Sequence, residues 1–382
     1  MLVIIIIKAL IQLLYPAPPV FTEQVIDSNI QIGYGIALGD VDGDGKPDIL
    51  LADAKQFVWY RNGDWKKFVM VDNLTERDNV CIAAADINGD GKVEVAVGAR
   101  WNPGETSDDK QSGSVHYLIR PKDPTQLWTP VELHHETTIH RMKWVQSAEG
   151  KYYLVVVPLH GKNNKGGEGK GVKILAYAFP ENVNKQWKII PLDTTLHLTH
   201  NIDIVKGTGN RAEGLYVASK EGIKFIPGNF LNKNIKAENI PGAEHGAGEV
   251  RGGNLTAVKK FIAAIEAMHG GEVVVYLKDN AVKRIVLDDN VKEGHALAVA
   301  DFSGTGNDQV VAGWRQPNKD GKVGVKIFTK KDSSGEQWEG AWIDDNGMAC
   351  EDIQVLDMNR DGKPDIVASG RATKNLKIYW NK

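Results

Sequence analysis

Three nine-residue segments place oxygen-bearing side chains at a spacing that suits a hard cation. Each segment has Asp or Asn at positions 1, 3 and 5, Gly at position 6, and Asp or Glu at position 9. Calcium takes about six to eight oxygen ligands, often around a sharp glycine turn. The segments are therefore predicted calcium loops. Their candidate ligands are Asp40, Asp42, Asp44, Asp48, Asp86, Asn88, Asp90, Glu94, Asp357, Asn359, Asp361 and Asp365.

These loops are not EF-hands, because an apolar strand-like run follows each at once and the EF-hand glutamate at position 12 is absent. A degenerate copy begins at Asp301. The four loop starts, at 40, 86, 301 and 357, leave one long interval that divides into four of about 54 residues. Seven repeats result, and a period near fifty with several short strands per repeat is typical of a β-propeller.

We therefore predict an all-β fold, a seven-bladed propeller of four-stranded blades over residues 17–382. The strand at 376–380 would be only the third of the last blade, and the chain ends there. Residues 21–26 resemble the outer strands of the other blades. We expect this N-terminal strand to complete the last blade, which closes the ring and removes an exposed sheet edge.

The face opposite the calcium loops is expected to gather histidines and cations. In each blade the first strand runs down the central channel and the second returns, so the start of the first and the end of the second share the upper face. The predicted starts of the first strands are Tyr34, Val80, His140, His200, His245, His295 and Glu351. The predicted residues after the second strands are Lys55, Arg100, His160, Lys220, His269, Arg315 and Arg371.

Two concentric rings of this kind would attract carboxylates or sulfates. The alternative for any single cation is a solvated residue that protects a sheet edge. Converging imidazoles suit zinc binding or proton transfer near neutral pH, and the predicted zinc cluster is His200, His245 and His295 with Glu351. The alternative for a histidine at a strand start is a structural, hydrogen-bonded role.

Two tryptophans adjoin ring cations. Trp101 follows Arg100 and Trp314 precedes Arg315, so both are candidate apolar faces for a sugar ring. Packing between blades is the alternative for both residues.

The loop pattern resembles the FG-GAP or VCBS-type repeat propellers. The segments His140–Trp144 with Pro158–Gly161, and Gly294–Asp301 with Gly313–Arg315, resemble the propeller domain of aldos-2-ulose dehydratase. That enzyme carries cupin domains after its propeller, and this sequence does not contain them. The pair His140 and His160 is similar to the histidine pair of propeller-type ulvan lyases. Those enzymes complete the site with a tyrosine and an arginine in the next blade, where this chain has His200 and Lys220.

The resemblance implies a carbohydrate carbon–oxygen lyase or dehydratase, because both families perform β-elimination. A base removes a proton beside a carbonyl or carboxylate, a cation or metal stabilises the enolate, and an acid assists the departing oxygen. The candidate catalytic residues are His140, His160, His200, Lys220 and Tyr34. The candidate substrate-binding residues are Lys55, Arg100, Trp101, His269, Trp314, Arg315 and Arg371. The alternative is a non-catalytic propeller that binds glycans or proteins.

Composition limits the partners. A net charge of -3 with 25% charged residues argues against a global affinity for nucleic acid, so the expected partner is a carbohydrate, either anionic or a keto-sugar. Residues 1–16 are expected to be either a signal peptide or a disordered leader. If Met1–Tyr15 acts as a signal the protein is periplasmic or secreted, and otherwise it is cytoplasmic. The apolar run is too short for stable membrane insertion. Cys81 and Cys350 are expected to be free, buried thiols.

Overall fold

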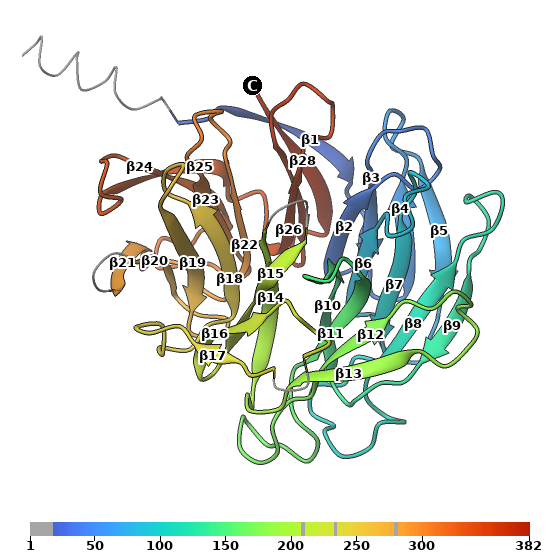
Figure 1. Ribbon diagram of the computed structural model, residues 1–382. Helices are drawn as coiled ribbons and strands as arrows, with labels where there is room; N and C mark the ends of the chain where they lie inside the picture. Colours follow the sequence, from blue (N-terminus) through green and yellow to red (C-terminus); the bar gives the residue numbers. More distant parts are fainter. Residues whose placement is uncertain (1–17, 208–210, 233–234, 279–281) are drawn as a thin grey trace, which may run out of the picture.

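The computed structural model describes residues 18–207, 211–232, 235–278 and 282–382. These residues form seven antiparallel four-stranded sheets, arranged as blades around a central channel (Figure 1). The predicted all-β, seven-bladed propeller is confirmed. The expected leader at 1–16 lies outside the described residues. Within the described residues, no helix has the length and apolar character needed to cross a membrane.

The four strands of each blade follow one another from the channel outward. Blade 1 holds β2 (Gly35–Gly39), β3 (Asp48–Ala52), β4 (Gln56–Tyr60) and β5 (Lys67–Asp72). Blade 2 holds β6 (Cys81–Ala85), β7 (Glu94–Ala99), β8 (Ser114–Ile119) and β9 (Thr129–Leu133). Blade 3 holds β10 (Ile139–Gln146), β11 (Tyr152–Pro158), β12 (Ile174–Ala178) and β13 (Lys188–Asp193). Blade 4 holds β14 (Thr199–Lys206), β15 (Ala212–Ser219), β16 (Gly222–Pro227) and β17 (Glu238–Asn239).

The remaining blades keep the same order. Blade 5 holds β18 (Glu249–Asn254), β19 (Lys260–Glu266), β20 (Glu272–Lys278) and β21 (Val282–Asp288). Blade 6 holds β22 (Gly294–Ala300), β23 (Gln309–Trp314), β24 (Gly324–Lys330) and β25 (Trp338–Asp345). Blade 7 holds β26 (Cys350–Leu356), β27 (Asp365–Gly370), β28 (Asn375–Asn381) and β1 (Phe21–Asp27).

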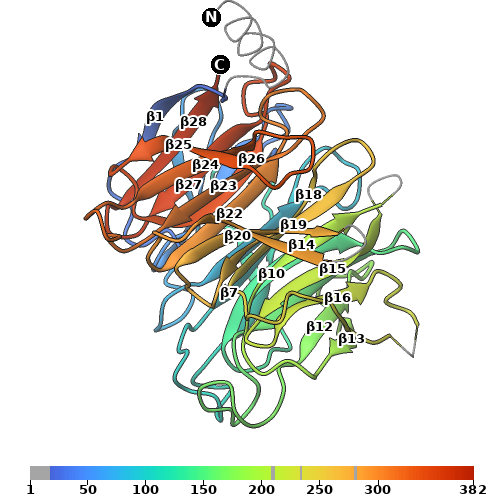
Figure 2. The same ribbon diagram turned by 90° about the vertical axis from the view of Figure 1, so that its left-hand side faces the viewer.

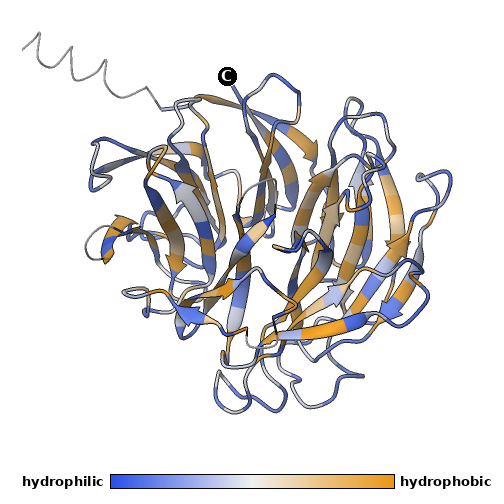
Figure 3. Cartoon of the chain, viewed as in Figure 1, coloured by the Kyte–Doolittle hydropathy of each residue, from blue (hydrophilic) through white to orange (hydrophobic). Residues whose placement is uncertain are grey.

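The second strands form the centre of the hydrophobic core. Every residue of β3, β7 and β23 is buried, because each of these strands has a neighbouring blade on both faces. Side chains from adjacent blades interlock there, as Leu50 and Trp59 of blade 1 do with Val95 and Val97 of blade 2. Each such burial contributes about 1.5–3 kcal/mol relative to exposure. Figure 3 shows hydrophobic colour concentrated along the strands and hydrophilic colour on many of the connecting loops.

The N-terminal strand closes the ring as predicted. β1 pairs antiparallel with β28, from Phe21 opposite Asn381 to Asp27 opposite Leu376, and the two lie side by side in Figures 1 and 2. Side chains reinforce the pairing, since Lys377 Nζ donates to Glu23 Oε2 at 2.9 Å. The prediction that both cysteines are free and buried is also confirmed.

Candidate functional site

The first predicted calcium loop brings three carboxylates together. Oxygens of Asp40, Asp42 and Asp48 lie within 4.8 Å of one another. The two oxygens of Asp40 also accept hydrogen bonds from the backbone N–H groups of Gly43 at 2.6 Å and Gly45 at 2.7 Å. Gly45 has a φ of 85°, a left-handed conformation that favours glycine. This donor set fits a calcium ion, because it offers several hard oxygens around one tight turn.

The other loops repeat this geometry with their own first residues. Asp86 accepts from the N–H of Gly91 at 3.0 Å, and Asp357 accepts from Gly362 at 2.8 Å. In the degenerate loop Asp301 accepts from Gly306 at 2.6 Å. The four loops therefore share one fold.

The ninth residue of each loop is turned inward. Asp48, Glu94 and Asp365 are buried, and each accepts the backbone N–H of the second loop residue. Burial raises the pKa of Asp48 to about 7, and it also raises the pKa values of Glu94 and Asp365. A bound cation would favour the ionised form of these carboxyls.

On the upper face, the structure corrects one member of the inner ring. β18 begins at Glu249, whereas His245 lies in the preceding loop with an exposed side chain. Blade 5 has no calcium loop from which to count, so the sequence offered no reliable register there. The other six predicted residues lie within one residue of the start of their first strands, and all are buried: Tyr34, Val80, His140, His200, His295 and Glu351.

Three histidines from three blades converge at the upper mouth of the channel. His200 on β14, His295 on β22 and His269, which follows β19, each offer a ring nitrogen, and these nitrogens lie within 4.8 Å of one another. The ring centroids are 4.7–4.9 Å apart. His269, predicted to bind substrate, therefore occupies the place expected for His245. We refer to His200, His269 and His295 as the histidine cluster.

Hydrogen bonds connect this cluster to a buried carboxylate. His269 Nε2 lies 2.9 Å from His200 Nε2, and His200 Nδ1 lies 3.1 Å from Glu249 Oε1 and 2.9 Å from the carbonyl oxygen of Gly248. On the solvent side, Arg315 Nη2 lies 3.4 Å from His269 Nδ1. A guanidinium only donates, so His269 accepts at Nδ1 and carries its proton on Nε2, toward His200.

The cluster also offers ligands for zinc. His200 and His295 both direct Nδ1 to an oxygen, the second to the carbonyl of Glu351 at 2.6 Å. This leaves Nε2 of His295 available, whereas Nε2 of His200 becomes available when His269 no longer donates to it. His269 fits as a third ligand once its Nδ1 no longer faces Arg315. The carboxylate of Glu351, predicted as a ligand, instead pairs with Arg315 at 3.2 Å and Arg371 at 3.1 Å.

Burial keeps these imidazoles neutral. It lowers the pKa of His269 to about 3, assisted by His200 and Arg315. It also holds the pKa values of His140, His200 and His295 well below the usual histidine value, with Arg141 or Arg315 adding to the effect. Neutral imidazoles can accept a proton or bind a metal at pH 7.

His140 joins this network, but it does not contact its predicted partner His160. Its Nδ1 lies 3.1 Å from the carbonyl oxygen of His200, and its Nε2 lies 3.2 Å from Arg141 Nη1. Among the described residues, no ring contact or hydrogen bond joins the side chains of His140 and His160. His160 Nδ1 is buried without a hydrogen-bond partner, and burial lowers the pKa of this imidazole. The predicted histidine pair is therefore not formed.

All seven predicted basic residues follow the second strands, but they do not form an open ring of positive charge. Four of them are ion-paired: Lys55 with Asp78, Lys220 with Glu168, Arg315 with Glu293 and Glu351, and Arg371 with Glu351. Arg100 donates to the carbonyl oxygen of Gly113 at 3.3 Å. The neighbouring acids reduce the field that the sequence predicted.

The predicted aromatic residues separate into different roles. Trp314 is fully buried and donates Nε1 to the carbonyl oxygen of Lys322, so it is a core residue and offers no face to a sugar. Trp101 is half-buried beside His140, at a ring distance of 5.1 Å. Tyr34 donates its hydroxyl to Asp78 at 3.1 Å, and burial raises the pKa of this phenol to about 12.

Sequence reasoning missed Glu249, Arg141, Lys143 and Arg251. Arg141 and Lys143 alternate along β10 and line the channel, a position that the period of two in a strand indicates. Glu249 and Arg251 were missed because the start of the first strand of blade 5 was predicted at His245 instead of Glu249.

Blades of this type, with calcium-type loops between their first and second strands, define an FG-GAP-repeat β-propeller. Residues 22–97 match the FG-GAP-like repeat family and residues 82–118 match the FG-GAP repeat family. Residues 112–279 match the family described as the β-propeller domain of aldos-2-ulose dehydratase. That stretch includes His140, His200, Glu249 and His269 but ends before His295. The chain is thus a seven-bladed propeller with FG-GAP-like repeats in residues 22–118 and a segment, 112–279, similar to that enzyme's propeller.

Solved structures share the fold at low identity. A chain of the mitotic checkpoint complex is 10% identical, with a TM-score of 0.58 over 94% of this chain and 93% of that chain. A chain of the complex of BBS1N with ARL6DN is 13% identical, with a TM-score of 0.57 over 96% of this chain and 98% of that chain. No curated protein is similar enough to count as a match. These likenesses establish the propeller fold alone.

Proposed function

We propose that the protein is a carbohydrate-active carbon–oxygen lyase or dehydratase that works by β-elimination at the upper mouth of its channel. The observation that carries this proposal is the histidine cluster, with neutral imidazoles linked to the buried Glu249 and bordered by Arg141 and Arg315. The match of residues 112–279 to a sugar-dehydratase propeller supports it. The substrate class is an anionic sugar or a keto-sugar.

His269 is the proposed base, because it is the member of the cluster that is partly exposed, whereas His200 and His295 are buried. It would take the proton beside the substrate's carbonyl or carboxylate and share the positive charge with His200 and Glu249. As the carbon–oxygen bond breaks, the imidazolium would return this proton to the departing oxygen, which leaves as water or an alcohol. Arg315 stands beside His269 and would stabilise the negative charge of the enolate. Trp101 would pack against the sugar ring.

His200, His269 and His295 would hold a zinc ion if one is bound, and the zinc would supply Lewis-acid stabilisation of the enolate oxygen. With zinc bound, His269 would be a ligand and could not also take the proton, so its role as base belongs to the metal-free site. We also propose calcium at the three intact loops, in a structural role.

Elimination creates a conjugated double bond that absorbs in the ultraviolet. The experiment is a screen of uronate polysaccharides and keto-sugars by absorbance, with and without added zinc. A time-dependent rise that needs the folded protein is expected. Binding without any absorbance change, across substrates that demonstrably bind, contradicts the lyase.

A second candidate is a non-catalytic glycan-binding propeller. The observation that favours it is the burial of His140, His200 and His295, each no more than 5% exposed, together with the ion-paired cations. Such a protein would bind a sugar on the upper face and leave it unchanged.

A further inference from the structure

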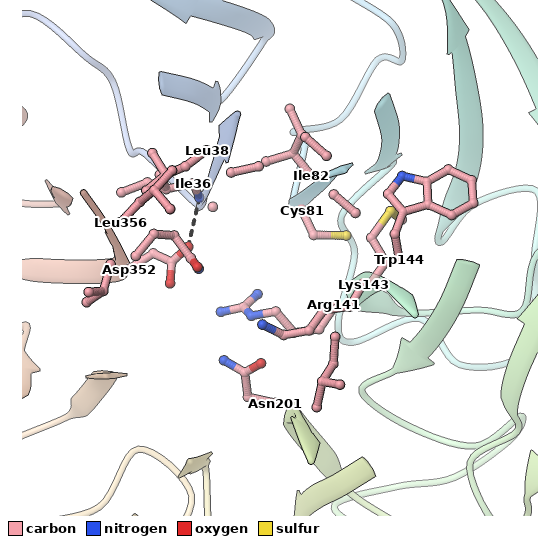
Figure 4. Close-up of a pocket in the computed structure, with 18 of the residues that line it drawn as sticks. Ile36, Leu38, Cys81, Ile82, Arg141, Lys143, Trp144, Asn201, Asp352 and Leu356 are labelled. Atoms are coloured by element: carbon pink, nitrogen blue, oxygen red, sulfur yellow. Dashed lines mark hydrogen bonds between the residues drawn. The ribbon is translucent and has the colours of Figure 1, made fainter. Parts of the chain in front are cut away.

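The central channel contains a cavity of about 250 Å³ below the histidine cluster. It is lined by the first strands of the blades, and Figure 4 shows its side chains converging from several of them. His200, His269 and His295 are not among the residues that line this cavity, so it is a site apart from the histidine cluster.

The charged lining of this cavity is predominantly cationic. Arg141 and Lys143 of β10 and Arg251 of β18 line it, with Asp352 of β26 as the carboxylate. Arg141 and Lys143 are two residues apart, so their side chains share the channel face of the strand. In Figure 4 both extend into the cavity, with Asn201 nearby and Asp352 on the opposite side.

Two of these cations have no carboxylate partner. Among the described residues, no hydrogen bond or ion pair reaches Lys143 Nζ. Arg141 Nη1 donates to the carbonyl oxygen of His140 at 3.0 Å and contacts its ring nitrogen, which are uncharged partners. Arg251 does pair with Glu249, at 3.4 Å.

The carboxylates around the channel are already engaged elsewhere. Asp352 accepts the backbone N–H groups of Ile36 at 2.7 Å and Ile353 at 2.9 Å, one on each oxygen. Asp203, behind the lining, accepts the N–H of Gly252 at 2.9 Å. Glu249 is shared among Asn201, His200 and Arg251. Asp203, Asp352 and Glu249 attract the Lys143 ammonium only from beyond ion-pair distance, and burial still lowers the pKa of this amine. An anion in the cavity would therefore stabilise the charged form.

We propose that the channel binds a small oxyanion group between Arg141, Lys143 and Arg251. The group is either the carboxylate of a single sugar acid or a free inorganic oxyanion such as sulfate. Guanidinium and ammonium groups bind such oxygens through charge-assisted hydrogen bonds. A cavity of this size is below the usual range for drug-sized ligands, so it suits one small acid rather than a polymer.

The ligand would enter from the calcium-loop face. At the lower end, Leu356 of β26 lines the same cavity and is 39% exposed. Because the histidine cluster is not part of the lining, this proposal does not depend on the proposed elimination.

The test measures binding of sulfate, glucuronate and neutral glucose by isothermal titration calorimetry at constant ionic strength. At least one anion is expected to bind saturably, and glucose is not. Tighter binding of glucuronate than of sulfate identifies a sugar acid as the ligand, and the reverse order identifies a free oxyanion. Failure of both anions to bind saturably overturns the proposal, whatever the elimination assay shows.

Matched variants locate the site. Lys143→Gln is expected to weaken anion binding by about 10-fold or more, because one charge-assisted hydrogen bond is lost. Lys151→Gln, at an exposed lysine outside the channel, is expected to leave it unchanged. Equal affinity in the two variants overturns the assignment.

A measurement on the wild-type protein covers the case in which Lys143→Gln does not fold. The bound anion should slow reductive methylation of Lys143, read by mass spectrometry, and should leave Lys151 unaffected. Equal rates for Lys143 with and without saturating anion overturn the site.

Discussion

At the residue scale, the position of His269 makes it the most informative side chain to change. His269→Gln is expected to lower turnover by about 10²-fold or more with little change in melting temperature, because the side chain is partly exposed but hydrogen-bonded into the cluster. The measurement is kcat on a substrate found in the absorbance screen. His134→Gln is the control, since its side chain is 56% exposed and lies outside the cluster. Retained turnover with easier unfolding would indicate a structural histidine.

The pH dependence of the reaction follows from the lowered pKa of His269. A base must be neutral to act, so its rate falls as pH drops through its pKa. With a pKa of about 3, His269 should show no loss in kcat/KM that reflects its own titration between pH 7 and pH 5. An acid limb centred near 6.5, the usual histidine value, would assign the base to an exposed imidazole instead.

The same shift affects stability. The unfolded chain protonates His269 near pH 6.5 and the folded chain only near pH 3, so the unfolded state binds more protons between these values. The free energy of unfolding therefore decreases as pH falls below about 6.5. His269→Gln should lose less melting temperature than wild type between pH 7 and pH 5. An identical pH slope for both proteins would contradict the burial of a neutral imidazole.

At the element scale, the calcium loops should contribute to stability through a bound ion. A ligand that binds the folded state alone raises the free energy of unfolding. Asp40→Asn should lower the calcium content and the melting temperature, and a chelator should lower the melting temperature of wild type. Asp72→Asn, at an exposed acid on β5, is the matched control. If chelation changes neither metal content nor melting, Asp40, Asp86 and Asp357 are turn residues only.

The loops also explain which parts of the molecule the sequence could predict. Where a loop is present, counting back from its first aspartate places Tyr34, Val80, His295 and Glu351 correctly, because both the loop and the strand have fixed lengths. Blade 5 has no calcium loop from which to count, and the start of its first strand was predicted at His245 instead of Glu249. The choice between packing and binding for Trp314 depended on its burial, which no local pattern reveals.

The sequence also could not predict that the three histidines of the cluster come together. His200, His269 and His295 are far apart in the chain, and their contact arises only when blades 4, 5 and 6 stand side by side around the channel. The pairing of Lys220 with Glu168 likewise depends on the path of the loop after β11. Neither relation follows from spacing alone, so the ring of charge predicted from seven basic residues was overestimated.

At the scale of the whole molecule, the ring depends on one non-local pairing, that of β1 with β28. Deleting residues 1–26 should expose the edge of β28 and remove the Glu23 partner of the buried Lys377. The expected result is aggregation or loss of a single cooperative unfolding transition, measured by light scattering and calorimetry. Deleting only residues 1–16 keeps β1 and should preserve cooperative unfolding. A monomeric, cooperatively folded product of the longer deletion would mean that blade 7 does not need its N-terminal strand.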